Sequence, residues 1–211
     1  MKYEWRKRDK DIYLPKKTPT VIQLKPMNYI TIKGEGRPGD MLFTECVQAL
    51  YSIAYGVKMA LKNKNIFEDY TDFTVFPLEG FWDLTDKGRE LYKNGVPVIE
   101  LKEHMAYKMM LRQPDFVSKD YVEFIQQSVY NKKKNEKVLE VVFETIDEGF
   151  VCQMIHVGSY DSEPTLFDLM ESYCNELGLT ILSKTHKEIY LTQPNDDPSK
   201  MKTTLRFKVK K

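Results

Sequence analysis

The chain has 211 residues, of which 42% are hydrophobic and 30% charged, a composition typical of a globular domain and not of a disordered chain. Its 32 basic and 31 acidic residues leave a formal net charge of +1, which gives no support for a nucleic-acid partner. No apolar run approaches the roughly 18 residues that a membrane helix needs, and no signal-peptide pattern is present. We therefore expect a cytoplasmic protein with neither a nucleic-acid nor a membrane partner.

The cysteines and the basic clusters suggest no special chemistry. Cys46, Cys152 and Cys174 stand far apart without C-x-x-C spacing, so we expect no metal, no disulfide framework and no cofactor. Basic residues gather in three places, where an anion would also fit, but we interpret all three clusters as solvated surface. They are Arg6 to Lys10, Lys132 to Lys134, and Arg206 to Lys211.

The first third of the chain predicts an arm, a strand, a turn and a long helix. Residues 1–20 are charged and contain two prolines, which indicates an arm. A strand is expected over 21–33, interrupted at Pro26, and the glycine-rich loop after it lacks the residues of a phosphate-binding loop. Asp40 is placed to cap a helix over about 41–62.

That helix carries two apolar stripes. The main stripe recurs at steps of three and four residues and predicts a face packed on a sheet. Its members are Phe43, Val47, Leu50, Ala54, Val57 and Leu61. Tyr51, Tyr55 and Met59 form a second stripe, which we interpret as the edge of the same core.

The segment 73–83 combines a short β-prone run, a break at Pro77, and then an acid, a glycine and two aromatic residues. We predict a strand over about 73–78, with Glu79, Phe81 and Trp82 at its exit. An aromatic pair after a glycine either fills a core or lines a pocket, and an acid beside aromatic faces suits a flat or cationic ligand.

The rest of the chain predicts two helices and five strands. Strands are expected over 98–112, 138–146, 150–157, 185–192 and 203–209, with the second and third joined as a hairpin. A helix over about 118–133 begins at the N-cap Ser118, and another over 164–177 stops at Gly178.

The order of these elements repeats. A strand, a glycine turn, a helix and two further strands occur in both halves, giving two β-α-β-β units over about 21–112 and 138–211, joined by the helix 118–133. We predict an α+β fold with one antiparallel sheet, helices on one face and a ligand cleft on the other, all in a single domain.

Strand alternation then predicts which side chains enter the cleft. If Ile189 and Leu191 pack under the helix, the alternate residues His186, Glu188 and Tyr190 point away from it. We expect them to meet Phe76, Trp82 and Tyr107 in an aromatic pocket that contains an acid.

Three ordered motifs carry a family resemblance. They are the segments 70–82, 109–117 and 186–191, which read YTDFTVFPLEGFW, MMLRQPDFV and HKEIYL. Together with the duplicated β-α-β-β plan, of the SHS2 type, they resemble the GyrI-like small-molecule-binding proteins over nearly the whole chain. The match is to the stand-alone branch, which has no DNA-binding domain.

The resemblance implies a cleft for hydrophobic, planar or cationic xenobiotics, as in the effector domains of multidrug-responsive regulators. It implies that Glu188 lies in this cleft, and that aromatic residues and one histidine line the cleft around the ligand. The expected lining residues are Phe76, Phe81, Trp82, Phe116, His156 and Tyr190.

Part of the stand-alone branch opens the cyclopropane ring of DNA-alkylating compounds by adding water, so the resemblance also implies a hydrolase as an alternative. Burial would raise the pKa of Glu79 or Glu188 toward the working pH, and Tyr107 would donate a hydrogen bond. His104 and His156 are further candidate bases, although a single histidine on a strand is more often structural. The sequence leaves open the choice between binding and hydrolysis, the acid involved and the oligomeric state.

Overall fold

A computed structural model of the protein describes residues 2–64, 71–158, 163–192 and 197–211. The chain divides into two compact units. The first unit contains residues 1–3, 27–76 and 82–146, and the second contains residues 4–26, 77–81 and 147–211. Tyr70 of the first motif lies outside the described residues.

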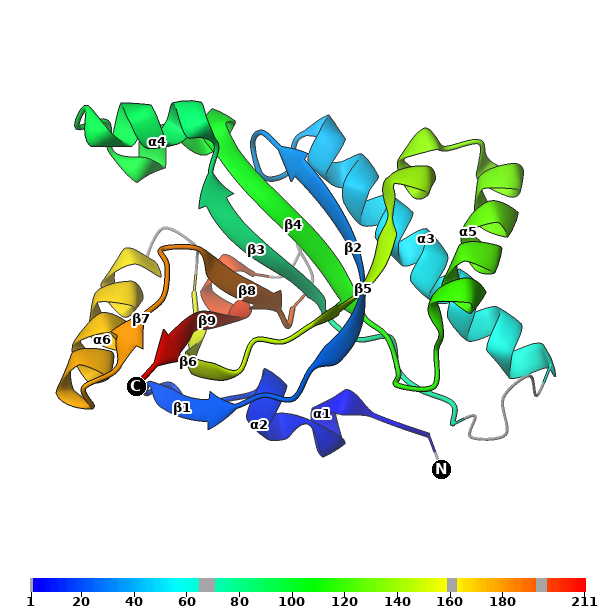
Figure 1. Ribbon diagram of the computed structural model, residues 1–211, viewed down its shortest axis with the longest axis horizontal. Coiled ribbons are helices and arrows are strands. Elements are labelled where there is room, and N and C mark those ends of the chain that lie inside the picture. The colour runs from blue at the N-terminus through cyan, green and yellow to red at the C-terminus, as the bar shows by residue number, and fades with distance from the viewer. Residues whose placement is uncertain (1, 65–70, 159–162, 193–196) are drawn as a thin grey trace. The chain divides into compact units, whose positions relative to one another are not determined.

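The first unit is built on strands β2 (Met27–Glu35), β4 (Met105–Arg112) and β5 (Val142–Ile146). Helix α3 (Met41–Lys64) packs against β2 and β4, and α5 (Lys119–Lys133) packs beside α3 (Figure 1). A short helix α4 (Asp86–Lys93) precedes β4. Three 3-10 helices complete the unit: η1 (Val98–Glu100), η2 (Lys102–His104) and η3 (Glu136–Glu140).

The second unit is built on strands β1 (Thr20–Gln23), β6 (Phe150–Val157), β8 (His186–Tyr190) and β9 (Lys202–Lys210). Helix α6 (Glu163–Glu176) packs against β6, and the two-residue strand β7 (Thr180–Ile181) pairs with β9. Two four-residue helices, α1 (Trp5–Arg8) and α2 (Lys10–Tyr13), form the N-terminal part of the unit, and η5 (Pro198–Lys200) precedes β9.

The two units share one topology. In each, the last strand of the repeat pairs with the first strand and with the strand before it, giving β2-β4-β3 in one unit and β6-β9-β8 in the other. Residues of strand β3 (Leu78–Leu84) belong to both units. The strand pairs β2–β4, β6–β9 and β8–β9 are antiparallel. The predicted α+β fold with duplicated β-α-β-β units is confirmed.

Four predicted strands differ in their limits or partners, and one of them, expected over 98–112, begins only at Met105, after η1 and η2. The strand over 21–33 is two strands separated at Pro26, and β1 pairs with β6 while β2 pairs with β4 and β5. The predicted hairpin 138–157 is wrong, because β5 pairs with β2, and η3 replaces its first residues. The segment 73–77 contributes only an isolated bridge at Phe73, and the strand begins after Pro77, whose ring cannot donate to a ladder.

The predicted helix signals are confirmed. Asp40 Oδ1 accepts a hydrogen bond from the Phe43 amide at 2.7 Å, and Ser118 Oγ accepts one from the Tyr121 amide at 3.3 Å. Gly178 follows α6 with a φ of 66°, the left-handed conformation that ends helices. No helix in the described ranges is long and apolar enough to span a bilayer.

The contact between α3 and α5 gives a first prediction. A Cβ on Gly56 would lie 2.8 Å from Cγ2 of Ile125 and 3.2 Å from Cγ2 of Val129. Alanine normally favours a helix over glycine by about 1 kcal/mol, but overpacking costs about 1–3 kcal/mol. We expect Gly56→Ala to lower the free energy of unfolding by up to about 2 kcal/mol in urea titrations.

The matched control is Ser172→Ala on the exposed face of α6, which should leave stability unchanged or slightly raised. If Gly56→Ala stabilised the protein as much as the control does, the close packing of α3 on α5 would be contradicted.

Candidate functional site

A lysine held between two acids lies at the centre of the second unit. Lys187 Nζ is 2.6 Å from Glu79 Oε2 and 2.7 Å from Glu148 Oε1, and all three side chains are at most 1% exposed. The ammonium also lies 5.1 Å from the ring centre of Phe81. Lys187 therefore occupies a site made of carboxylates and an aromatic face, the combination that binds a cation.

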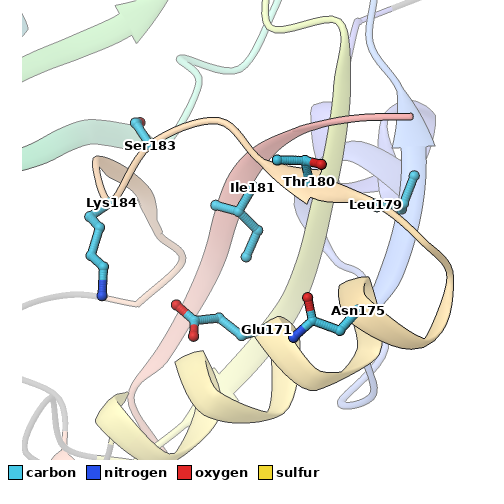
Figure 2. Close-up of a pocket in the computed structure, with 7 residues that line it drawn as sticks. All are labelled: Glu171, Asn175, Leu179, Thr180, Ile181, Ser183 and Lys184. Carbon is cyan, nitrogen blue, oxygen red and sulfur yellow. The ribbon is translucent and has the colours of Figure 1, made fainter.

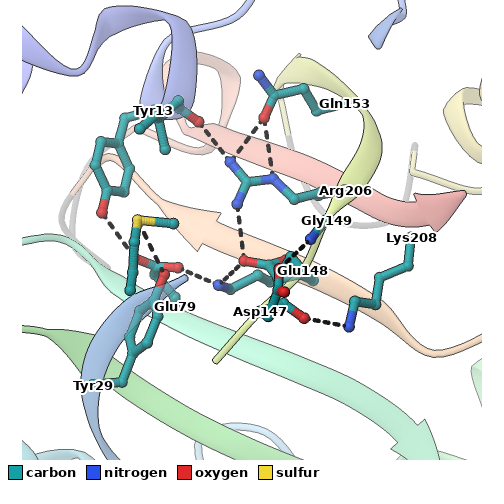
Figure 3. A network of polar contacts seen from close by, with 12 residues as sticks. Tyr13, Tyr29, Glu79, Asp147, Glu148, Gly149, Gln153, Arg206 and Lys208 are labelled. Carbon is teal, nitrogen blue, oxygen red and sulfur yellow. Dashed lines mark hydrogen bonds and ion pairs between the residues drawn. The ribbon is translucent and has the colours of Figure 1, made fainter. Parts of the chain in front are cut away.

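Arg206 extends this network. Its guanidinium donates to Glu148 Oε1 at 3.2 Å and to Gln153 Oε1 at 3.1 and 2.8 Å, and Figure 3 shows it lying between these two side chains. It also donates to the carbonyl of Ile12 in α2 at 2.7 Å. The interpretation of Arg206 as a solvated cation is wrong, since the residue is only 1% exposed.

The N-terminal helices complete the network. Tyr13 Oη donates to Glu79 Oε1 at 3.2 Å, and Gln153 Nε2 donates to the carbonyl of Asp11 at 2.6 Å. Thr204 Oγ1 donates to the carbonyl of Tyr13 at 2.8 Å. The predicted arm is thus partly helical, and α2 covers the sheet face that carries the charges.

Lys187 and Glu148 each favour the charged form of the other. Burial alone would raise the pKa of Glu148, but Lys187 and Arg206 outweigh it and hold this pKa below its ordinary value. Burial alone would lower the pKa of Lys187, but Glu148 and Glu79 outweigh it and raise this pKa. Two cations and two anions neutralise one another, as buried charges require.

Register shows which residues share this face. Lys187 lies opposite Arg206, and Glu188 lies opposite Leu205, which belongs to the core under α6 with Met170 and Cys174. Directly opposed residues of an antiparallel pair point to the same side of the sheet. Glu188 therefore faces α6, and the prediction that Ile189 packs under the helix is wrong by one residue of register.

The α6 face of the second unit carries three of the predicted site residues. His186 Nε2 lies 3.0 Å from Glu188 Oε1, and the His186 ring is 4.7 Å from Phe167 of α6. His156 lies on this face too, since it is opposite Thr203, as is Tyr190. Glu188 and His156 are 9% and 3% exposed, so this is a nearly dry group of one acid and two imidazoles.

A cluster of aromatic rings forms in the first unit. Trp82 lies 5.5 Å from Tyr107 and 5.8 Å from Phe43 between ring centres, and Phe43 lies 5.2 Å from Tyr107. The Tyr107 ring passes so close to Gly34 that a Cβ there would lie 2.4 Å from its hydroxyl oxygen. The sequence predicted that Trp82 and Tyr107 would meet, but it assigned Phe43 to the helix core alone.

Tyr107 is a poor acid in this position. Burial and the neighbouring Cys46 thiol, 4.0 Å from its hydroxyl, raise its pKa far above the ordinary value of 10. The phenol therefore stays protonated, and its hydroxyl donates to Cys46 Sγ.

The remaining predicted residues lie apart from this cluster. Phe76 packs on Tyr3 at 6.1 Å and under the Arg112 guanidinium at 4.8 Å, and Phe116 packs on Phe73 at 6.3 Å. Phe81 lies with Lys187. The predicted residues therefore belong to several groups of contacts within the two units.

Lys187 was missed as the partner of Glu79, and Glu148 and Arg206 were missed as the other charges of this network. The available signal was the charged side chain of Lys187 in a strand whose neighbours at odd positions are apolar, which marks a buried and paired charge. His104 stands in η2 next to α4, where its carbonyl accepts a hydrogen bond from the Thr85 amide. No group of three metal-binding side chains occurs in the described part of the chain.

Comparison with known structures identifies the family. An uncharacterized conserved protein from Listeria innocua is 32% identical, with a TM-score of 0.87 over 99% of this chain and 100% of that one. A hydrolase from the same organism is 31% identical, with a TM-score of 0.88 over the full length of both chains. The chain belongs to the family of these Listeria proteins.

A more distant likeness concerns the fold alone. The C-terminal domain of EcmrR is 14% identical, with a TM-score of 0.51 over 95% of this chain and 99% of that domain. The fold is consistent with the GyrI-like fold that the sequence motifs predict. Neither a protein-family model nor a curated protein matches the chain.

A separate surface hollow of about 380 Å³ lies between α6 and β7 (Figure 2). Its lining is largely polar, with Glu171 and Asn175 from α6 facing Thr180, Ser183 and Lys184. None of the residues predicted from the sequence lines this hollow, so it is not the expected aromatic pocket.

The network gives a second prediction. Lys187→Met leaves Glu79 and Glu148 as buried carboxylates that have lost a shared counter-ion, so we expect the free energy of unfolding to fall by about 3–5 kcal/mol. The control is Lys208→Met on β9, because Lys208 donates to the exposed carbonyl of Asp147 and makes a smaller contribution than Lys187 to the lowered pKa of Glu148. Equal effects of the two variants in urea titrations would contradict the role of Lys187.

The buried side chain of His156 gives a third prediction. Burial lowers the pKa of His156 below 6.5, although Glu188 acts in the opposite direction. A lowered folded-state pKa contributes stability above about pH 6.5 that is lost as the pH falls through the folded value. We expect the urea midpoint of the wild type to decrease between about pH 7 and pH 5, and the midpoint of His156→Gln to decrease less. Parallel plots of midpoint against pH for the two proteins would contradict this prediction.

Proposed function

We propose that this protein binds a hydrophobic, planar small molecule at the aromatic cluster of Phe43, Trp82 and Tyr107. The observation that carries the proposal is the mutual approach of these three rings, which come from α3, β3 and β4. Aromatic walls with a few polar groups are typical of sites for small planar ligands. The protonated Tyr107 hydroxyl, which donates to Cys46 Sγ in the structure, is the polar group that would turn toward an acceptor on the ligand.

The surroundings of the cluster support access to it. Phe43 is only half-buried, and the next two residues toward the N-terminus of α3, Leu42 and Met41, are 48% and 74% exposed. Gly34 presents no side chain toward Tyr107. A flat ligand that displaces the half-buried Phe43 ring then stacks on Trp82, since offset-stacked aromatic pairs are favourable.

The ligand is neutral rather than cationic. Glu79 and Phe81 would suit a cation, but the ammonium of Lys187 already holds that position. Glu188 is paired with His186. A cationic ligand would have to break an internal ion pair in order to reach either acid, whereas a neutral ring system binds without breaking one.

The chain's two tryptophans make a direct test, the fourth prediction. A neutral polycyclic compound such as phenanthrene should quench the fluorescence saturably in the wild type and in Trp5→Phe, but not in Trp82→Phe. Trp5 is the control because it packs on Tyr13 in the other unit. Quenching that persists in Trp82→Phe would overturn the assignment of this site.

Hydrolysis is a second candidate function, favoured by the hydrolase among the 31% identical relatives. Here water would add to a strained, electrophilic cyclopropane ring. The water oxygen bonds to a ring carbon, the carbon–carbon bond breaks, and its electron pair moves to a conjugated carbonyl oxygen that takes up a proton. Glu188, beside His186, is the candidate to accept the proton of water, and Glu79 is held by Lys187 instead.

Mass spectrometry of the recovered ligand separates binding from hydrolysis. A cyclopropane-bearing ring system returned with the mass of one added water would establish the hydrolase. Loss of this product in Glu188→Gln but not in Glu79→Gln would assign the acid. A ligand returned unchanged by a protein that binds it would leave binding as the function.

A further inference from the structure

A groove of about 650 Å³ lies between α3 and the end of α5, within the first unit. This volume is in the range of sites for small organic molecules. Its lining residues come from the outward side of α3 and from the residues that end and follow α5. They are Val47, Gln48, Tyr51, Ser52, Tyr55, Lys133 and Asn135.

The groove presents two aromatic rings. Tyr51 and Tyr55 are stacked, with ring centres 6.2 Å apart and planes 28° from parallel. Tyr55 and Met59, of the stripe assigned to the core edge, are each 52% exposed, so this stripe is not covered as the sequence suggested. Two adjacent, partly solvated rings offer a flat ligand a surface for stacking.

The polar groups of the groove are mostly donors. Lys133 Nζ donates to Ser52 Oγ at 2.8 Å, and in the described part of the chain no carboxylate pairs with it. Asn135 uses its Oδ1 to accept from the Lys137 amide, which leaves its amino group for a ligand. Burial and the neighbouring Tyr55 raise the pKa of Tyr51, so its hydroxyl stays a donor.

The acids of the neighbouring segment are engaged elsewhere. Glu136 accepts from Tyr130 Oη at 3.0 Å, and Glu140 accepts from Lys137 Nζ at 2.8 and 2.9 Å. The three consecutive cations 132–134 outweigh the partial negative charge at the end of α5. The groove therefore combines an aromatic surface with excess positive charge.

We propose that the groove between α3 and α5 binds a planar aromatic anion, such as an aromatic carboxylate. The ring stacks on Tyr51 and Tyr55, and the carboxylate accepts from Lys133 and from the amino group of Asn135. This site is distinct from the Trp82 cluster, because none of the three rings of that cluster lines the groove.

The test, which is the fifth prediction, uses naphthalene-2-carboxylate and its neutral amide, naphthalene-2-carboxamide, in calorimetric titrations. We expect the carboxylate to bind saturably to the wild type and to bind about fivefold more weakly to Lys133→Met. Lys132→Met is the matched control, since Lys132 is also exposed but does not line the groove. Tyr55→Ala should weaken the binding of both compounds.

The same titrations in Trp82→Phe separate this site from the proposed function. Binding of the carboxylate that persists in Trp82→Phe and responds to Lys133→Met supports the groove, whatever becomes of the Trp82 site. Three results would each overturn the proposal: no saturable binding by the wild type, equal effects of Lys133→Met and Lys132→Met, or an amide that binds as tightly as the carboxylate.

Discussion

The ion pairs of Lys187 are the constraint on which the second unit depends. A fully buried ammonium costs far more free energy than folding provides unless acids surround it, and here Glu79 and Glu148 do so at 2.6 and 2.7 Å. These partners come from β3 and from the residue before the turn into β6, so the charge balance fixes where both segments lie in this unit. Arg206 then needs α2 for its last hydrogen bond.

The same ion pairs separate this protein from what its motifs suggest. An acid and an aromatic ring after Pro77 match a site for a cationic ligand, and in this chain the cation is the side chain of Lys187. An internal ammonium has no translational freedom to lose on binding, so an external cation competes poorly with it. We propose that ligand recognition then falls to uncharged rings such as Trp82 and Tyr107.

Much of the fold could be predicted from the sequence, because helix caps and alternation are local. Asp40 and Ser118 cap as expected, and the β4 pattern that places Met109 and Leu111 on one face follows from period two. The choice of face in β8 depends on its register with β9. One residue of offset decides whether Glu188 or Lys187 joins the network, and no local pattern contains that information.

Partner choice was also beyond local patterns. A short turn between 146 and 150 normally joins a hairpin, but here its two strands pair with different strands, and Glu148 in that turn becomes a buried ligand of Lys187. The Trp82 cluster was found in part because aromatic residues at strand positions signal packing. Its third ring, Phe43, comes from a helix stripe that reads equally well as core.

The bond between Arg206 and the Ile12 carbonyl joins residues 194 positions apart. At translation rates of about 5–20 residues per second, the N-terminal helices emerge roughly 10–40 s before the strand that binds them. Throughout that interval Tyr13 and Trp5 lack the sheet they will pack on. The N-terminal segment of the nascent chain therefore cannot complete its native contacts until β9 has left the ribosome.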